Sequence, residues 1–304
     1  MKKNENQPIV LVRILLILIL AYLAFYMFRI AKEKKYIEGL DQKKKFTLKT
    51  NDNIFDTFYC DVYDKLMYDK NKIDYEIEEI TRVTKIKKKS TILDIGSGNG
   101  HHVGSLCANN MNAVGIDKSE AMVLSSKKKY PKCYFKTGDI MTTFKDNKEL
   151  YSHILCMYFT IYYIKDKTAF FKKCYNLLKP GGYLILHLVN RDTFDPMVSL
   201  SNPLVIVSPQ SVAKKRITKS AVIFEGFQYK AQFKTLNKKN IGLFEEKMID
   251  KNNKVRKNIH TLFMEKQNNI IQNALKEGFL LNGKIDMMPV QYENQYLYIL
   301  QCSK

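Results

Sequence analysis

The segment TILDIGSGNGHH, residues 91–102, constrains the fold of this chain more than any other stretch. A short apolar run leads directly into three alternating glycines, Gly96, Gly98 and Gly100. In open parallel sheets a ligand binds outside the carboxyl ends of the strands, where a glycine-rich turn exposes backbone N–H groups at a helix N-terminus. The segment therefore predicts the first strand of such a sheet, followed by a ligand-binding turn.

The residues that follow alternate between strand-like and helix-like patterns. We predict strands at 91–95, 112–116, 133–137, 152–158 and 182–189, separated by helices at about 100–109, 119–129 and 166–178. A helix at about 266–277 and two final strands, which return to the main sheet, complete the pattern. This alternation predicts an α/β fold with a doubly wound, mostly parallel, seven-stranded sheet.

Two segments stand outside this alternation. Before the first strand, apolar residues at spacings of three and four predict one or two amphipathic helices within 54–88. Residues 191–260 contain strand-like runs with turns at 237–240 and 250–254, so we assign them to a small inserted antiparallel sheet. Together with the main sheet, these segments define one domain at 51–304.

The first 50 residues differ in composition from this domain. Residues 9–28, IVLVRILLILILAYLAFYMF, carry a single charge at Arg13, and about 20 apolar residues suffice for a helix to cross a hydrocarbon core. Four basic residues directly follow this run and two precede it, which favours a cytoplasmic main domain. We therefore expect a tail at 1–8, a transmembrane helix at 9–28 and a basic linker at 29–50, in a single-pass membrane protein.

Composition narrows the partners only in part. The formal net charge of +20 and a pI near 9.5 would suit an anionic partner such as nucleic acid or an acidic membrane surface. The alternative is a biased, solvated surface, because the lysines are scattered and Lys, Asn, Ile and Tyr are all abundant. The six cysteines lie far apart without the spacing of a zinc site, so we expect reduced cysteines and no metal.

Acidic residues follow three successive predicted strands. Asp94 lies in the first strand, Asp117 comes 23 residues later after the second, and Asp139 comes a further 22 residues on after the third. The position that a dinucleotide-binding fingerprint requires to be glycine is His101, and no GKS or GKT follows, which weighs against a dehydrogenase and a P-loop. We expect the three carboxylates to meet at one edge of the sheet.

With these motifs the sequence resembles the class I S-adenosylmethionine-dependent methyltransferases. ILDIGSGNG, VGID, TGDI and LKPGGYLIL stand in that family's order over residues 54–190, and more loosely to 304. The resemblance implies S-adenosyl-L-methionine as cofactor, with its methionine moiety on Asp94 and the backbone of 96–100, its ribose on Asp117 and its adenine near Asp139. The cofactor-binding set that it implies is Tyr59, Tyr63, Asp94, Gly96, Ser97, Gly98, Asn99, Gly100, Asp117, Lys118, Asp139, Ile140 and Cys156. For the two tyrosines, helix packing is the alternative role.

The resemblance also bears on the methyl acceptor. After the fourth strand, Cys156-Met157-Tyr158 replaces the Asp or Asn, Pro, Pro and aromatic run of enzymes that methylate amino groups of DNA or glutamine. This departure, and an antiparallel insert of the kind that roofs the acceptor pocket in relatives, resemble small-molecule methyltransferases. The leading expectation is a membrane-anchored enzyme that acts on a small-molecule or lipid-like acceptor.

Methyl transfer from a sulfonium depends mainly on holding the reactants in line, and a base helps where the acceptor is an amine or hydroxyl. Our candidates for the acceptor side are Tyr158, His187, Arg191 and His260, with Tyr162 nearby. For the two histidines the alternative is a packing role, and we expect His101 and His102 to cap or pack the helix after the glycine turn.

Two other functions remain open at this point. An RNA or protein acceptor is suggested by residues 206–260, where 13 Lys or Arg and 4 Asp or Glu give a net charge of 13 − 4 = +9, although nucleic acid is not the favoured partner. A non-catalytic membrane scaffold with the same fold is the third possibility.

Overall fold

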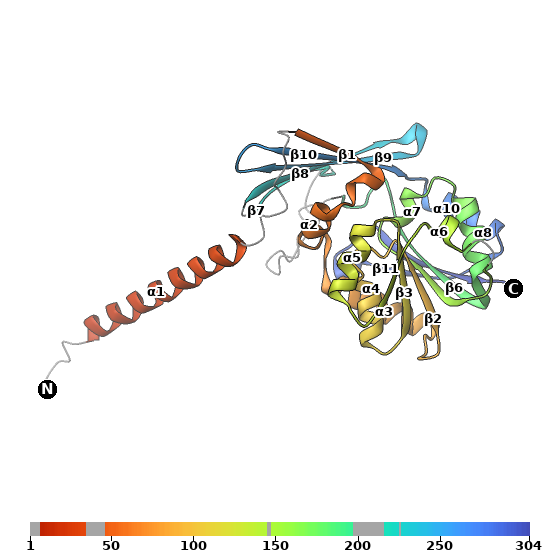
Figure 1. The fold of residues 1–304 in the computed structure, drawn as a ribbon, viewed down its shortest axis with the longest axis horizontal. Coiled ribbons are helices and arrows are strands. Elements are labelled where there is room, and N and C mark those ends of the chain that lie inside the picture. Colours follow the sequence, from red (N-terminus) through yellow and green to blue (C-terminus); the bar gives the residue numbers. More distant parts are fainter. Residues whose placement is uncertain (1–6, 35–45, 145–146, 197–215, 225) are drawn as a thin grey trace.

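The computed structural model describes residues 7–34, 46–144, 147–196, 216–224 and 226–304. Figure 1 shows two sheets, with the smaller sheet lying across one end of the larger one, and an N-terminal helix that extends away from both. The larger sheet and its helices carry the glycine turn, and the smaller sheet covers it.

The larger sheet has seven strands in the order β11-β12-β6-β5-β2-β3-β4. These strands are β2 (Thr91–Ile95), β3 (Asn112–Asp117), β4 (Tyr134–Thr137), β5 (Tyr151–Cys156), β6 (Leu178–Val189), β11 (Phe279–Asp286) and β12 (Gln295–Cys302). All neighbouring pairs from β6 to β4 are parallel, whereas β12 is antiparallel to both β6 and β11.

The α/β fold is thus as predicted, but the sheet is mixed. Only residues 287–294 connect β11 to β12, and a parallel crossover needs a dozen residues or more. The short connection therefore forces β12 to run in the opposite direction. One predicted strand also ends early, because the chain leaves β5 after Cys156 and Tyr158 takes a left-handed conformation, with φ of 50°.

Helices cover both faces of this sheet (Figure 1). They are α3 (Lys70–Thr84), α4 (His101–Ala108), α5 (Glu120–Lys129), α8 (Lys167–Leu177) and α10 (Gln267–Lys276), with short α6 (Ile140–Thr143) and α7 (Thr160–Tyr163) after β4 and β5. Side chains of β2 point alternately to the two faces of the sheet and so belong to two hydrophobic cores. Leu93 and Ile95 pack with α8 and α10, whereas Ile92 packs with α3 and α4. On α3, Ile73, Ile77 and Ile80 form the buried stripe that the helical spacing predicted.

The smaller sheet has five strands in the order β1-β10-β9-β8-β7. They are β1 (Phe46–Thr50), β7 (Lys219–Phe224), β8 (Phe227–Leu236), β9 (Ile241–Asp250) and β10 (Val255–Phe263). The last four are antiparallel neighbours within the predicted insert, and the turns at 237–240 and 250–254 lie where the sequence placed them. We call this sheet the roof.

One edge of the roof comes from an unexpected part of the chain. β1 lies in the segment predicted to be a linker, yet it pairs in parallel with β10 from Phe46–Val255 to Thr50–Ile259. Beneath the roof, α2 (Thr57–Met67) buries Tyr59, Val62 and Leu66 against β8 and β9. Arg256 links these elements, because its guanidinium donates to both carboxylate oxygens of Asp56, the residue that caps α2.

The N-terminal helix α1 spans Gln7–Lys34 and contains the apolar run at 9–28. In the part of the chain that the structure describes, no helix combines the length and the apolar character needed to cross a membrane. The predicted transmembrane helix is therefore not supported, although its residues are helical.

Candidate active site

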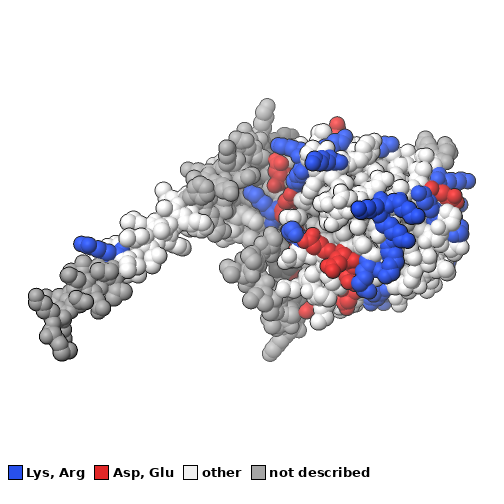
Figure 2. All heavy atoms as spheres, turned by 90° about the horizontal axis from the view of Figure 1, so that it is seen from below, with Lys and Arg blue, Asp and Glu red and all other residues white. Residues whose placement is uncertain are grey.

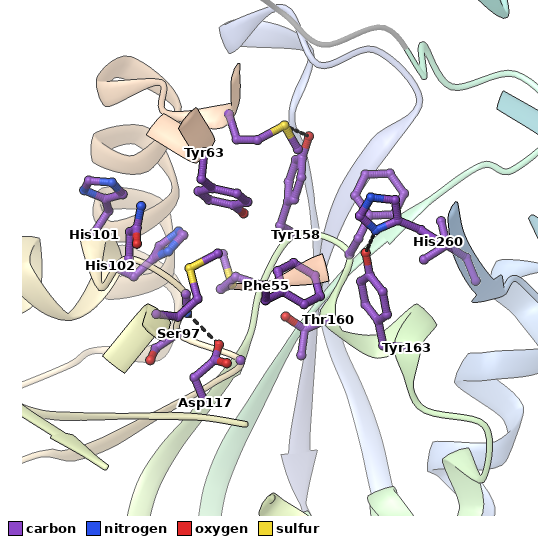
Figure 3. A pocket seen from close by; sticks show the side chains of 18 of the residues that line it. Phe55, Tyr63, Ser97, His101, His102, Asp117, Tyr158, Thr160, Tyr163 and His260 are labelled. Carbon is purple, nitrogen blue, oxygen red and sulfur yellow. Dashed lines mark hydrogen bonds between the residues drawn. The ribbon is translucent and has the colours of Figure 1, made fainter. Parts of the chain in front are cut away.

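A pocket of about 1500 Å³ opens at the carboxyl ends of the parallel strands, between the larger sheet and the roof. The glycine turn and the ends of β2, β3 and β4 form its floor, α2 and α3 contribute one wall, and β9 and β10 contribute Phe244, His260 and Leu262. Figure 3 shows that Tyr63 and Tyr158 lie across the pocket from Asp117. The topology thus brings together side chains from distant parts of the sequence.

The three glycines of the turn all have positive φ, at 67°, 53° and 81° for Gly96, Gly98 and Gly100. A Cβ atom on Gly98 would meet nothing within 4 Å, because this residue faces open space in the pocket. On Gly100 it would come within 2.7 Å of Phe135 and Ser126. Gly100 was predicted to line the cofactor site, but it does not line the pocket, and its role is close packing of α4 against the sheet.

Asp94 lies at the base of the pocket and is only 1% exposed. Its Oδ2 atom has no hydrogen-bond partner among the described residues, and neither do Ser97 Oγ and Asn99 Oδ1, which line the same turn. Burial raises the pKa of Asp94 to about 7, with a smaller contribution from the charges of Asp117 and Glu76. A cationic ligand would offset the free-energy cost of burying the charged Asp94 carboxylate.

Asp117 ends β3 and binds the glycine turn directly. Its Oδ2 accepts a hydrogen bond from the Gly98 N–H at 2.9 Å, and its Oδ1 accepts one from the Ser119 N–H at 2.8 Å. Burial raises the pKa of this carboxyl. Because a carboxylate oxygen has more than one acceptor direction, both oxygens can also accept from a ligand hydroxyl.

The third acid, Asp139, follows β4 and also lines the pocket, together with Lys118 and Ile140. Its Oδ1 accepts from the Met141 N–H at 2.9 Å and thereby caps α6, and its Oδ2 lies 3.2 Å from Lys118 Nζ. Ile140 is buried beside it. The three acids and the glycine turn therefore form one continuous surface, as the sequence predicted.

Tyr59 and Tyr63 both line the pocket, and their rings pack edge to face at 5.9 Å. The Tyr59 hydroxyl donates to Glu246 Oε1 at 3.1 Å, so this side chain joins α2 to the roof and is buried. Tyr63 points into the pocket (Figure 3). The structure is thus compatible with a cofactor contact for Tyr63 and gives Tyr59 a clear packing role.

Three residues that the sequence assigned to the site, Cys156, His187 and Arg191, do not line the pocket. Cys156, the last residue of β5, is fully buried in the core, and burial raises the pKa of its thiol. His187 is also fully buried: its Nδ1 accepts from the Tyr158 N–H at 3.1 Å and its Nε2 pairs with Gln295 Oε1. Burial, followed by the charge of Lys72, lowers the His187 pKa to about 3.

Arg191 and Tyr162 likewise serve the fold. Arg191 Nη1 donates to Asn240 Oδ1 and to the Met264 carbonyl, both at 2.6 Å, so it ties β6 to the roof. The Tyr162 hydroxyl accepts from the Val189 N–H at 2.8 Å. The predicted cofactor contact of Cys156 and the predicted acceptor-side roles of His187 and Arg191 therefore disagree with the structure, because all three side chains are buried outside the pocket wall.

The other two acceptor-side candidates do line the pocket. The Tyr158 hydroxyl points towards Met67, with 3.9 Å from its oxygen to Sδ, and burial raises its pKa well above the usual value. His260 projects from β10, where its two ring nitrogens contact Tyr163 and Glu246.

Sequence reasoning missed a charged cluster in the same pocket. On α3, Lys72 Nζ lies 2.7 Å from Glu76 Oε1, and His102 Nε2 lies 2.8 Å from Glu76 Oε2. Burial alone would raise the pKa of Glu76, but the charge of Lys72 and the hydrogen bond from His102 lower it to about 2. The spacing of four between Lys72 and Glu76 was the available signal, and it does not distinguish a buried pair from a solvated one.

His101 differs from the expectation of a simple cap. It lines the pocket, its Nε2 lies 2.9 Å from Asp64 Oδ1, and its Nδ1 lies 2.6 Å from the Tyr130 hydroxyl. Both histidines after the glycine turn thus pack the helix and also bind acidic residues of α2 and α3.

This fold and site define a Rossmann-like methyltransferase domain, and comparison with known proteins agrees. A family model described as "Methyltransferase domain" matches residues 92–182. A protein of Mycolicibacterium smegmatis, described as a "Probable S-adenosylmethionine-dependent methyltransferase", is 24% identical over 105 residues. That match covers 34% of this chain and 40% of the relative, so it spans less than half of the relative's length.

Solved structures show the same fold across most of the chain. A S-adenosylmethionine-dependent methyltransferase from Clostridium acetobutylicum superposes with a TM-score of 0.62 at 17% identity, covering 81% of this chain and 98% of that one. The CcbJ methyltransferase of Streptomyces caelestis gives 0.63 at 11% identity, with coverages of 81% and 96%. CalS10, an amino pentose methyltransferase of Micromonospora echinaspora solved with bound S-adenosylmethionine, gives 0.53 at 15% identity, with coverages of 76% and 90%.

Residues 92–182 therefore match a methyltransferase domain, and the chain has the fold of S-adenosylmethionine-dependent methyltransferases. The ligand to compare with this site is S-adenosylmethionine. The residues present fit this molecule. The orphaned, buried Asp94 carboxylate suits its ammonium group, the open space at Gly98 admits its close approach, and Asp117 has acceptor capacity left for ribose hydroxyls.

Proposed function

We propose that this chain transfers the methyl group of S-adenosylmethionine to a nitrogen or oxygen atom of a small-molecule or lipid-like acceptor bound beneath the roof. The observation that carries the proposal is the extent of the pocket, which continues from the glycine turn to aromatic side chains of α7 and the roof. Pockets for a single small ligand usually measure about 300–1000 Å³. At about 1500 Å³, this one has room for an acceptor beside the cofactor.

The walls of the pocket indicate what the chain contributes to methyl transfer and what the cofactor contributes. S-adenosylmethionine supplies an electrophilic methyl group when bound, and this chain has to orient an acceptor towards it and exclude water. Phe55, Tyr163 and Phe244 surround the acceptor side with aromatic faces. Such walls favour an apolar or cationic acceptor over a polyanionic one, because aromatic faces attract cations.

Two fold relatives guide the choice of acceptor. CalS10 is described as an amino pentose methyltransferase, and KedS8 of a Streptoalloteichus species as a sugar N-methyltransferase. Both act on small molecules by their descriptions, and an amine is therefore the first acceptor class to test for this chain.

A macromolecular acceptor has less support. Figure 2 shows basic side chains in a band over one face of the body, with a group of acidic side chains beside it rather than an unbroken basic surface. A non-catalytic scaffold would not need to keep a buried carboxylate such as Asp94, whose Oδ2 has no hydrogen-bond partner within the described ranges, since that arrangement costs stability unless a ligand binds.

We also propose that residues 9–28 attach the enzyme to a membrane, with the methyltransferase domain on the cytoplasmic side. The support is the apolar run itself and the exposure of large apolar side chains of α1 between Ile14 and Met27. Flotation of the full chain with vesicles of phosphatidylcholine and phosphatidylglycerol tests this proposal. Replacement of four exposed apolar residues by serine should abolish flotation, and flotation that persists would contradict it.

The test of the activity uses methyl-labelled S-adenosylmethionine with the full chain, an amino sugar panel and a lipid extract in parallel reactions. The expected result is a labelled product in one of these two fractions that is absent with Asp94→Asn. Label that enters only added RNA or protein would overturn the choice of acceptor. Tight cofactor binding without any labelled product above the mutant background would overturn the catalytic proposal.

A further inference from the structure

We propose that Tyr163, His260 and Glu246 form a proton relay that accepts the proton of the methyl acceptor. Tyr163 is the catalytic residue that touches the acceptor, and the other two act through it. The inference rests on the proposed methyl transfer and deepens it, because it assigns the acceptor class as a neutral nitrogen or oxygen that carries a hydrogen.

The three side chains form a continuous row of hydrogen-bond contacts, from Tyr163 through His260 to Glu246. The Tyr163 hydroxyl lies 2.6 Å from His260 Nδ1, and His260 Nε2 lies 2.8 Å from Glu246 Oε2. They come from α7, β10 and β9, so the roof supplies His260 and Glu246, and the short helix after β5 supplies Tyr163. Figure 3 shows the Tyr163 hydroxyl directed at the imidazole of His260.

The surroundings of Glu246 fix its ionisation state. It is 1% exposed and accepts hydrogen bonds from the hydroxyls of Tyr59 and Tyr229, from Asn258 and from His260. Burial by itself would raise the pKa of Glu246, but its interaction with His260 and the hydrogen bonds from Asn258 and Tyr229 lower it. Glu246 is therefore a carboxylate that only accepts hydrogen bonds.

That state determines the direction of the other hydrogen bonds. Because Glu246 can only accept, His260 Nε2 carries a hydrogen and donates it. In the neutral imidazole Nδ1 is then free of hydrogen and accepts from the Tyr163 hydroxyl. The oxygen of Tyr163 keeps its lone pairs for a donor on the pocket side.

Tyr163 stands at the boundary between the cofactor site and the roof. It lies one turn after Thr160, whose side chain packs over Gly96 of the glycine turn. Phe55 packs edge to face on the Tyr163 ring at 5.6 Å, and Phe244 packs on His260 at 5.5 Å. Tyr163 and His260 both line the pocket, so the relay ends where an acceptor would lie.

Burial raises the pKa of Tyr163 well above its usual value, and the charge of Glu246 adds to this effect. A stable phenolate is therefore excluded as the base. A hydroxyl that passes one proton on while it receives another needs no phenolate, and this is the role that the geometry supports.

The chemical step balances as follows in atoms and electrons. The lone pair of the acceptor nitrogen or oxygen forms the new bond to the methyl carbon as the carbon–sulfur bond breaks, and the electron pair of that bond stays on sulfur. The hydrogen of the acceptor moves to the oxygen of Tyr163, and the hydroxyl hydrogen of Tyr163 moves to His260 Nδ1. The resulting imidazolium is stabilised by the Glu246 carboxylate and returns its proton to solvent after product release.

The first test measures the relay without an acceptor. The chain has five histidines, so ¹⁵N-histidine NMR of the full chain saturated with S-adenosylhomocysteine can resolve them. His187 should be neutral with hydrogen on Nε2, because its Nδ1 accepts from the Tyr158 N–H. We expect a further histidine in this tautomer, whose Nδ1 resonance shifts in Tyr163→Phe and disappears from the spectrum in His260→Gln. A His260 that is cationic at pH 7.5, or that carries hydrogen on Nδ1, would overturn the relay.

The second test measures methyl transfer to the best amine of the amino sugar panel. Tyr163→Phe and His260→Gln should each lower kcat by about 100-fold or more, the usual worth of a positioned proton acceptor, with KM and the S-adenosylhomocysteine affinity within twofold of wild type. Glu246→Gln should lower kcat less, because it acts through His260. Tyr162→Phe is the matched control, since it makes the same change on the same helix away from the pocket, and it should keep wild-type kcat.

These outcomes separate the relay from the proposed function. An unchanged kcat in Tyr163→Phe, with an active wild type, would overturn the relay and leave methyl transfer intact. If wild type binds cofactor but methylates no amine, the acceptor proposal fails, and the NMR tautomer still decides whether the relay exists.

Discussion

Replacement of Asp94 by asparagine should make the cofactor-free protein more stable and the cofactor site non-functional. Asp94 is buried without a hydrogen-bond partner for Oδ2 among the described residues, and its pKa is raised from 3.8 to about 7. A carboxyl whose folded-state pKa lies above its unfolded value loses stability as the pH rises between those values. The Asp94 carboxyl should therefore lower the stability of wild type relative to Asp94→Asn more at pH 8 than at pH 5.

The magnitude follows from the two pKa values. A difference of about three pKa units corresponds to about 4 kcal/mol of lost stability above pH 7. Asparagine removes this cost but buries an amide that lacks a partner, at about 1–3 kcal/mol. At pH 8 we expect Asp94→Asn to raise the free energy of unfolding by about 1–3 kcal/mol. At pH 5, where Asp94 is protonated, the two proteins should differ by less than about 1 kcal/mol.

Urea unfolding at the two pH values measures this effect, and calorimetric titration measures the cofactor. Loss of a charged hydrogen-bond partner for the ammonium group should weaken S-adenosylmethionine binding by about 2–3 kcal/mol, or about 30-fold to 150-fold. Equal stability changes at pH 5 and pH 8 would refute the assignment of a buried, strained carboxyl. Unchanged cofactor affinity would refute its role as the ammonium partner.

Three further predictions concern the turn, the roof and α3. Gly98→Ala should weaken S-adenosylmethionine binding, because its methyl group would enter open pocket space, but it should cost only about 1 kcal/mol of stability. Gly100→Ala should instead cost about 1–3 kcal/mol of stability through overpacking. Calorimetry and urea unfolding of both variants check this contrast. Arg256→Met should destabilise the protein by about 1–3 kcal/mol, because it removes the charged hydrogen bonds to both oxygens of Asp56, which keeps Lys49 as a partner. A Tm equal to that of wild type in differential scanning fluorimetry would count against the link. Lys72→Met should cost about 3–5 kcal/mol by leaving a buried carboxylate on α3 with histidine partners alone, and an unfolding midpoint in urea that matches wild type would show that the pair is not a structural one.

The main sheet could be predicted because its signals are local. Each parallel strand is a short apolar run, each helix after it has its own periodicity, and the glycines at 96–100 mark the turn. The reversal of β12 was not in those patterns, since strand direction depends on the length of the connection at 287–294 and on the partner strand.

The acceptor side could not be predicted to the same extent, because its contacts join distant residues. His187 faces Gln295, 108 residues away along the chain, and nothing in the run ILHLVNR indicates that both ring nitrogens are engaged. Tyr163 and His260 are 97 residues apart, and their contact requires the roof to lie over α7. β1 was read as linker because five residues next to a basic run carry too weak a pattern, and pairing with β10 decides their structure.

The central claim is that the glycine turn and its acids bind S-adenosylmethionine. Calorimetric titration of S-adenosylmethionine and S-adenosylhomocysteine into the full chain and into Asp117→Ala tests it most directly. Asp117 holds the Gly98 N–H and is free to accept ribose hydroxyls, so its removal affects both parts of the site. The account predicts one-to-one binding to wild type and a loss of at least about 30-fold in the variant. Absence of binding to a wild-type protein with a cooperative unfolding transition would contradict it.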